Sequence, residues 1–199
     1  MKKLLILGGS SGFGLSLSKA FANHYLVTAT GRRNFSYPNV TCLTLDTAHL
    51  DHNLLRSIEP QIIVNNGYDK RDHISSFGNS ISVVREAIKY FKDNGGGAIL
   101  NVNSIAGLLP DTKDPDYAAS KHGLKGYIDS VSHDAYLSNI KILNLYPRAI
   151  STGMSEGRSD FSVLINPDEL ANFCVSLLAT KSFYVSTIVF DRCLPSECV

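Results

Sequence analysis

The chain has 199 residues, of which 44% are apolar and 19% are charged, and its formal net charge is +1. This composition is typical of one globular domain with a substantial core, and the near-neutral charge gives no electrostatic case for binding nucleic acid or an anionic membrane. The apolar run behind Lys3 ends at Gly8, which is too short for a secretory signal, and no run is long enough to span a bilayer. We therefore expect a single domain over residues 1–199, located in the cytoplasm.

Strand-like and helix-like segments alternate along the chain. Short apolar or β-rich runs predict seven strands, at 3–7, 25–30, 40–45, 61–66, 97–104, 140–146 and 183–190. Apolar residues at helical spacing predict the helices between them, at 14–25, 50–58, 77–92, 115–137 and 167–179. This alternation implies right-handed crossovers, so we expect an α/β fold with a doubly wound, mostly parallel sheet and helices on both faces.

A glycine-rich turn, LGGSSGFG, joins the first predicted strand to the first predicted helix. Gly8, Gly12 and Gly14 follow the spacing G-x-x-x-G-x-G. A helix N-terminus offers unpaired N–H groups and partial positive charge to a pyrophosphate, and glycines let the backbone approach that ligand closely. The common dinucleotide fingerprint, G-x-G-x-x-G, has a different spacing. A purely structural glycine turn is the alternative interpretation.

Two arginines, Arg32 and Arg33, follow the second predicted strand, and no Asp or Glu occurs between positions 25 and 45. In dinucleotide-binding folds a carboxylate at this place binds the ribose of NAD, whereas arginine accommodates the 2′-phosphate of NADP. The segment therefore predicts that NADPH is preferred over NADH. Two solvated surface arginines are the alternative.

Three residues suit acid–base chemistry beside such a coenzyme. Ser104 stands at the carboxyl end of a predicted strand, and Tyr117 and Lys121 are one helical turn apart, so phenol and ammonium share a helix face. A nearby ammonium favours the phenolate, so we expect Lys121 to lower the pKa of Tyr117. With Ser104 polarising the substrate oxygen, this set would protonate a carbonyl as hydride arrives or deprotonate an alcohol as hydride leaves.

From the first strand to about residue 191, these motifs resemble the short-chain dehydrogenase/reductase family. The family pattern T-G-x-x-x-G-x-G corresponds to LGGSSGFG with Leu7 in place of threonine, and N-N-A-G appears as NNGY. The pattern P-G-x-x-x-T reads PRAIST, with Arg148 in place of glycine, and the tail after Asp191 departs from the family's Asp-Gly-Gly. The resemblance implies a Rossmann fold and an NADP(H)-dependent oxidoreductase acting on a small-molecule carbonyl or alcohol.

The resemblance also implies roles for individual residues. Ser104, Tyr117 and Lys121 match the catalytic residues, and Asn79 is the candidate for an asparagine that relays protons to the lysine. Anchoring the match on VVREAI places that asparagine position nearer Ser76, and a helix N-cap is the alternative role for Asn79. The implied coenzyme-binding residues are Gly8, Ser10, Ser11, Gly12, Phe13, Gly14, Arg32, Arg33, Asp46, Asn66, Gly67, Tyr117, Lys121, Pro147, Ile150 and Thr152.

Other features bear on the substrate, the assembly and competing functions. The region that forms the substrate lid in the family, here Gly153 to Asn166, is short and suggests an open pocket. Family members pair through the helices at 77–92 and 115–137, so a homodimer or homotetramer is the assembly implied by analogy. A non-catalytic NADP(H) sensor and a redox-neutral reaction such as epimerisation are the competing functions.

We expect free thiols and no metal site, because the four cysteines have no C-x-x-C spacing and the histidines are scattered. The cysteines are Cys42, Cys174, Cys193 and Cys198.

Overall fold

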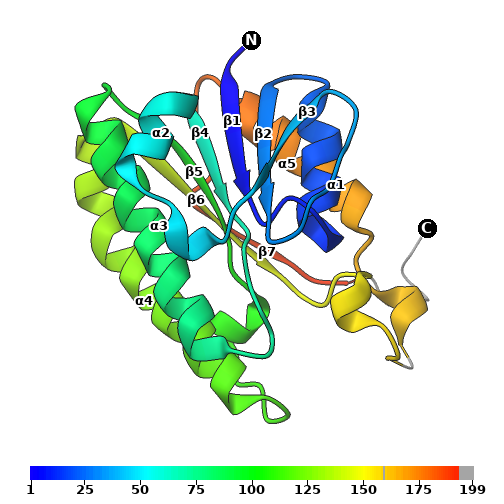
Figure 1. Cartoon of the computed structure of the whole chain (residues 1–199). Helices are drawn as coiled ribbons and strands as arrows, with labels where there is room; N and C mark the ends of the chain where they lie inside the picture. The colour runs from blue at the N-terminus through cyan, green and yellow to red at the C-terminus, as the bar shows by residue number, and fades with distance from the viewer. Residues whose placement is uncertain (159, 193–199) are drawn as a thin grey trace.

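The computed structural model describes residues 1–158 and 160–192 (Figure 1). Over these residues the chain forms the following strands and α-helices: β1 (Lys3–Leu7), α1 (Gly12–Ala22), β2 (Leu26–Gly31), β3 (Val40–Thr44), α2 (His52–Ile58), β4 (Ile62–Asn65), α3 (His73–Asp93), β5 (Gly97–Val102), α4 (Pro115–Leu137), β6 (Ile140–Pro147), α5 (Pro167–Ala179) and β7 (Thr187–Phe190). Short 3₁₀ turns cover Thr47–His49 (η1), Ile105–Gly107 (η2), Gly153–Ser155 (η3) and Phe161–Val163 (η4).

The seven strands form one sheet in the order β3-β2-β1-β4-β5-β6-β7, and every neighbouring pair is parallel. The predicted doubly wound α/β fold is therefore confirmed. Helices α1 and α5 cover one face of the sheet, and α2, α3 and α4 cover the other (Figure 1). Because all strands are parallel, their carboxyl ends share one edge, which is where ligands bind in open sheets of this kind.

Each face of the sheet has its own apolar core, as the sequence of the central strands dictates. In β1 the side chains alternate between the two faces, so Leu5 packs with α3 and α4 whereas Leu4 packs with α1 and α5. Both leucines are fully buried. This burial on both sides is why β1 reads as a continuous apolar run rather than an alternating one.

The last strand differs from its predicted bounds. The sequence predicts strand over 183–190, but β7 covers only Thr187–Phe190. Pairing with β6 begins where Asn144 faces Thr187, and the residues before Ser186 do not pair with the first half of β6. Tyr184 and Val185 pack against the core from an irregular segment instead.

Buried asparagines connect the carboxyl halves of three adjacent strands. Asn65 on β4 donates through Nδ2 to Asn101 Oδ1 on β5 at 2.9 Å, and Asn101 Nδ2 donates to Asn144 Oδ1 on β6 at 2.7 Å. Asn65 Nδ2 also donates to the backbone carbonyl of Ser80 at 3.2 Å, which ties α3 to the row. Buried amides need such partners, so the row fixes the strand register next to the functional edge.

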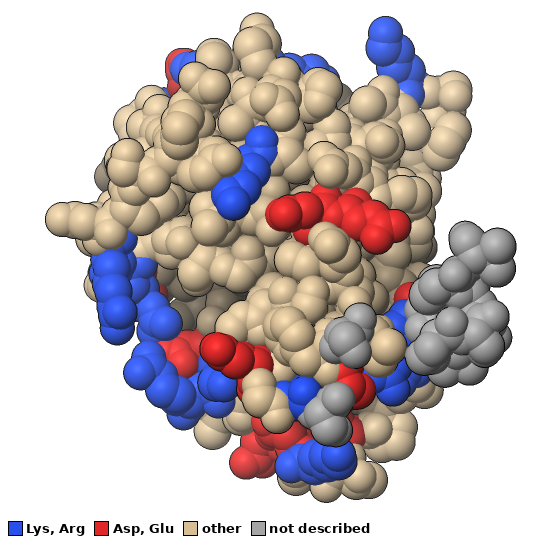
Figure 2. All heavy atoms as spheres, turned by 90° about the vertical axis from the view of Figure 1, so that its right-hand side faces the viewer, with Lys and Arg blue, Asp and Glu red and all other residues tan. Residues whose placement is uncertain are grey.

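The segment predicted as a short lid runs between β6 and α5 and carries the turns η3 and η4. Asp160 within it forms ion pairs with Arg158 and with Arg192. Figure 2 shows this side of the molecule, where charged side chains of both signs gather in the lower part while the upper part is largely uncharged. In the part of the chain that the structure describes, no helix has the length and apolar character needed to cross a membrane.

Cys42 and Cys174 are free thiols. The predictions for Cys193 and Cys198 concern residues outside the described ranges.

Candidate active site

At the glycine turn after β1, three segments of the backbone lie very close to one another. Gly8 has φ +75°, and a β-carbon there would lie 2.7 Å from the Cα of Gly67. A β-carbon on Gly14 would lie 1.9 Å from the carbonyl oxygen of Gly8. Asn66 Nδ2 donates to that same oxygen at 3.0 Å. Because side chains would clash at these positions, the glycines are required for the turn itself as well as for any ligand over it.

The turn leaves the start of α1 open to an anion. Ser11 is the N-cap residue, but its hydroxyl makes no capping hydrogen bond, and the first turn carries no acidic residue. Unpaired N–H groups and partial positive charge at a helix N-terminus attract phosphate. Thr152 stands opposite, with its side chain 3.6–3.9 Å from where a β-carbon of Gly12 would be. These residues fit the pyrophosphate of a dinucleotide.

The other residues expected near the turn lie around its rim. The Ser10 side chain packs against Gly31 at the end of β2, and Phe13, in the first turn of α1, is buried. Asp46 caps η1, where its Oδ1 accepts from the backbone N–H of Ala48 at 3.0 Å. Gly67 faces Thr47, whose Cγ2 would lie 2.6 Å from a β-carbon at that glycine.

The two arginines after β2 are both exposed, and one of them is paired. Arg32 Nη1 contacts Asp69 Oδ2 at 2.5 Å, and Asp69 also accepts from Arg71. The two guanidinium groups hold the pKa of the Asp69 carboxyl far below its usual range, so it is charged at neutral pH. Arg33 lies beside Arg32 on the exposed surface. The structure therefore brings the predicted phosphate-binding cation together with a carboxylate that the sequence interpretation missed.

Ser104 follows β5 at the carboxyl edge, where it caps the turn η2. Its Oγ accepts from the backbone N–H of Ala106 at 3.2 Å. The preceding residue, Asn103, accepts from the Ser104 backbone N–H at 3.0 Å and donates through Nδ2 to the Lys121 carbonyl at 3.2 Å. Asn103 thus fixes the end of β5 to α4, which sets the distance between the serine and the helix.

Local sequence determines where α4 begins and therefore where Tyr117 stands. Asp114 caps the helix, its Oδ1 accepting from the Tyr117 backbone N–H at 3.0 Å, and Pro115 occupies the first turn. Lys121 follows one turn later and is only 5% exposed. Its Nζ lies 5.7 Å from the centroid of the Tyr117 ring. The structure thus brings the predicted phenol and amine together beside Ser104.

One electrostatic prediction is wrong. We expected Lys121 to lower the pKa of Tyr117, but burial of the phenol raises that pKa, the Ser104 side chain lowers it in part, and the carboxylates of Asp111 and Asp114 add to the rise. Burial also lowers the pKa of Lys121 to about 8. Desolvation is therefore the main influence on both groups, and Lys121 lies nearer to another ring than to Tyr117.

That other ring belongs to Tyr68, a residue that the sequence interpretation did not assign to the site. Lys121 Nζ lies 4.2 Å from its centroid, within cation–π range. The Tyr68 hydroxyl is hydrogen-bonded to His73 Nδ1 at 2.7 Å and to Ser120 Oγ at 3.0 Å. Its ring packs edge-on against Tyr117, with centroids 5.5 Å apart. The signal was the replacement of the family's N-N-A-G by NNGY, which puts an aromatic side chain where the family has none.

Asn79, the residue expected to act as a relay asparagine, lies on the helix next to the acid–base residues without a direct hydrogen bond to them among the described residues, so the relay role stays a prediction. Asn79 lies inside α3, half-buried, and the helix is capped by Asp72, so the alternative N-cap role for Asn79 is wrong. Among residues 1–158 and 160–192, no hydrogen bond joins the Asn79 side chain to Tyr117 or Lys121. Ser76, the other candidate, is buried and bonded to the backbone of Asp69 instead.

The remaining predicted residues line the lid side of the edge. Pro147 ends β6, and Ile150 forms an isolated bridge with Ile165 that anchors the lid to the core. Beyond them lies a hollow of about 490 Å³. It is lined by Ser151, Thr152, Gly153, Glu156, Gly157 and Phe161. Because Thr152 also faces the glycine turn, this open hollow adjoins the pyrophosphate cradle.

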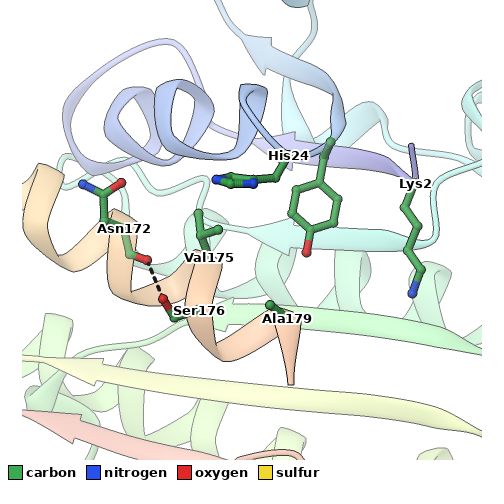
Figure 3. Close-up of a pocket in the computed structure, with 7 residues that line it drawn as sticks. Lys2, His24, Asn172, Val175, Ser176 and Ala179 are labelled. Carbon is green, nitrogen blue, oxygen red and sulfur yellow. Dashed lines mark hydrogen bonds between the residues drawn. The ribbon is translucent and has the colours of Figure 1, made fainter. Parts of the chain in front are cut away.

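A second hollow, of about 520 Å³, lies at the opposite edge of the sheet, between the ends of α1 and α5 (Figure 3). Lys2, His24, Tyr25, Asn172, Val175, Ser176 and Ala179 line it. Most of these side chains are exposed. It is separate from the candidate active site, because strands begin at this edge and the acid–base residues stand where they end.

Known proteins match both the sequence and the fold. The family model described as short chain dehydrogenase matches residues 72–162. The 3-oxoacyl-acyl-carrier-protein reductase FabG of Chlamydia muridarum is 24% identical over 93% of each chain. A short-chain dehydrogenase from Burkholderia cenocepacia in complex with NADP superimposes with a TM-score of 0.79 at 17% identity, covering 96% of this chain and 90% of that one.

A 4-hydroxyisoleucine dehydrogenase complexed with NADH superimposes with a TM-score of 0.75 at 22% identity, covering 96% of this chain and 97% of that one. Similar proteins of this fold are thus found with either nicotinamide coenzyme. Together with the parallel sheet and the glycine turn, these matches show that the chain is similar to members of the short-chain dehydrogenase/reductase family, which are oxidoreductases that transfer hydride with a nicotinamide nucleotide.

Proposed function

We propose that this protein is an NADPH-dependent carbonyl reductase in which Tyr117 is the proton donor. The observation that carries the proposal is the gathering of Ser104, Tyr117 and the buried Lys121 at the carboxyl edge of β5, next to a glycine turn that leaves the start of α1 open. Burying an ammonium costs free energy, and perturbed groups of this kind cluster at active sites.

The chain's own residues supply orientation and a proton. The bound coenzyme supplies the hydride. The Ser104 hydroxyl, next to the phenol, donates a hydrogen bond to the substrate carbonyl oxygen and orients it. Tyr117 then gives its phenolic proton to that oxygen as negative charge develops there. Because burial raises the pKa of Tyr117, the phenol is protonated at neutral pH, which is the form that reduction needs.

Lys121 completes the site in two ways. Its pKa of about 8 lets it exchange a proton near neutral pH, so it can restore the proton that Tyr117 has given up. By resemblance to the family, its amine also binds the ribose next to the nicotinamide. In that role the amine, which lies 4.2 Å from the centroid of the Tyr68 ring, would donate to ribose hydroxyls.

Arg32 supports the preference for NADPH, since its guanidinium offers several donors to a 2′-phosphate. Fluorescence of reduced nicotinamide reports binding well here, because the chain contains no tryptophan. We expect Arg32→Ala to weaken NADPH binding by about ten- to a hundredfold and to leave NADH binding unchanged, since a charge-assisted hydrogen bond contributes about 1.5–3 kcal/mol. Arg56→Ala, an exposed arginine on α2, is the control. Equal affinity of the wild-type protein for both coenzymes would refute the preference.

A non-catalytic NADP(H) sensor is the competing function, and the Tyr68 ring over Lys121 is the observation that favours it. NADPH oxidation measured against a panel of aldehydes, ketones and quinones separates the two. An enzyme consumes NADPH with at least one carbonyl class. Tight NADPH binding without turnover on any member of the panel would identify a sensor.

A further inference from the structure

The Arg32–Asp69 ion pair spans the end of the central strand. Arg32 directly follows β2, and Asp69 follows β4, while the strand order is β2-β1-β4. The pair therefore crosses the carboxyl end of β1, where the glycine turn begins. A dinucleotide whose pyrophosphate rests on that turn has to lie next to this pair.

Asp69 is the fixed partner of the two. Its backbone N–H donates to Ser76 Oγ at 2.8 Å, and its carbonyl accepts from the same hydroxyl at 3.1 Å. The Arg71 guanidinium donates two hydrogen bonds to the Asp69 carboxylate, from Nε to Oδ1 at 3.0 Å and from Nη2 to Oδ2 at 2.7 Å. The side chain of Arg32 is 54% exposed and contacts only Oδ2, so it is the partner that can turn toward a ligand.

One charge in direct contact with Arg32, the Asp69 carboxylate, opposes the binding of a second anion. Asp69 is fully ionised and stands within direct contact of the guanidinium that would hold the 2′-phosphate. A phosphate that approaches Arg32 has to replace this contact or accept repulsion from the carboxylate at short range. An uncharged ribose 2′-OH meets neither penalty.

From this arrangement, and resting on the proposed use of NADPH, we infer that Asp69 is a specificity-determining residue that competes with the coenzyme 2′-phosphate for Arg32. Asp69 lowers the affinity for the coenzyme that carries the 2′-phosphate and leaves the affinity for the coenzyme without it unchanged. The discrimination between NADPH and NADH is therefore set by the Arg32–Asp69 pair and not by Arg32 alone.

The test uses calorimetric titration with adenosine 2′,5′-bisphosphate and with AMP, because these probes contain the adenosine end and no nicotinamide and differ only in the 2′-phosphate. We expect Asp69→Asn to tighten binding of the 2′,5′-bisphosphate about two- to fivefold, which is the range for an exposed ion pair, and to leave AMP binding unchanged. In an Arg32→Ala background the same substitution should have no effect. Glu59→Gln, which removes a carboxylate from the surface ion pair with Lys3 at the opposite edge, controls for net charge.

Each outcome bears on the inference. Weaker binding of the 2′,5′-bisphosphate by Asp69→Asn would overturn it, because Asp69 would then be organising Arg32 for the phosphate. An unchanged affinity, in a variant whose thermal unfolding matches wild type, would also overturn it. Asn keeps the backbone bonds to Ser76, and Asp69→Ala provides a second variant should Asn alter folding.

The proposed coenzyme preference has a separate readout. If wild type prefers the 2′,5′-bisphosphate over AMP but Asp69→Asn does not change this, the inference fails and the preference stands. If wild type shows no preference and Asp69→Asn gains one that depends on Arg32, the inference stands and the proposed preference fails. If neither protein discriminates, both fail.

Discussion

Replacing the buried Lys121 by methionine should make the protein more stable and less active. Methionine has a similar length and no charge, so it removes the ammonium with little change in packing. The pKa of Lys121 falls from 10.5 to about 8 on burial, and about 1.4 kcal/mol per unit makes the cost of burying its charge about 3 kcal/mol. Loss of the cation–π contact with Tyr68 destabilises the folded protein by about 1 kcal/mol and offsets part of this gain. We expect the free energy of unfolding at pH 7 to rise by about 2 kcal/mol.

The pH dependence gives this prediction its sign. The folded-state pKa of Lys121 lies below the unfolded value, so between about pH 8 and 10.5 the unfolded chain binds more protons than the folded one. Wild-type stability should therefore rise through this window by about 1.4 kcal/mol per pH unit relative to Lys121→Met, and the gap between the two proteins should close. Urea unfolding followed by circular dichroism measures it. Lys125→Met, a partly exposed position on the same helix, should show no such convergence. A Lys121→Met protein less stable than wild type at pH 7, or a gap independent of pH, would refute the reasoning.

Three further substitutions test the frame around the site, each by urea unfolding. Gly14→Ala should lower the free energy of unfolding by about 3 kcal/mol, because its β-carbon would lie 1.9 Å from a backbone oxygen. Gly126→Ala, with open space around it in α4, should raise the free energy of unfolding by up to about 1 kcal/mol. Equal effects would contradict the turn geometry. Asn101→Ala should lower the free energy of unfolding by about 2–3 kcal/mol, since it breaks two hydrogen bonds in the buried row and leaves Asn144 Oδ1 without its donor. An unchanged stability would show that water replaces the lost hydrogen bonds. Tyr68→Phe keeps the ring over Lys121 but loses the hydrogen bonds to His73 and Ser120. It should lower the free energy of unfolding by about 1–2 kcal/mol and leave the pH dependence of stability as in wild type. A changed pH dependence would mean that the hydroxyl, and not the ring, acts on the lysine.

Most of the fold could be predicted from the sequence, because the signals for its helices and strands were local and mutually consistent. Helices α4 and α5 have the predicted bounds, since Asp114-Pro115 and Asn166-Pro167 mark their starts with a capping side chain and a proline. The strand predicted at 183–190 is too long because residues 183–186 are as β-prone as residues 187–190, and only the pairing partner on β6 decides where β7 begins.

The site was predicted in its parts but not in its interactions. Spacing alone placed Tyr117 and Lys121 on one helix face. It could not show that Tyr68, from a loop far away in the sequence, would pack against the amine, nor that burial would outweigh the amine in setting the pKa of Tyr117. Desolvation depends on what the tertiary fold packs around a group, and a motif does not encode it. The Arg32–Asp69 ion pair was missed because it also joins two segments that are distant in the sequence and meet only in the fold.

The central claim is that Tyr117 donates the proton at a site that binds NADPH independently of it. A single-turnover measurement tests this most directly: protein loaded with NADPH is mixed with an excess of a carbonyl that the wild type reduces, and the loss of coenzyme fluorescence is followed in wild type, Tyr117→Phe and Tyr136→Phe. Tyr136, exposed near the end of the same helix, is the matched control. We predict that all three proteins bind NADPH with similar affinity, that Tyr136→Phe consumes it at the wild-type rate, and that Tyr117→Phe is slower by about 10²–10⁴-fold. Consumption by Tyr117→Phe at the wild-type rate would contradict the account.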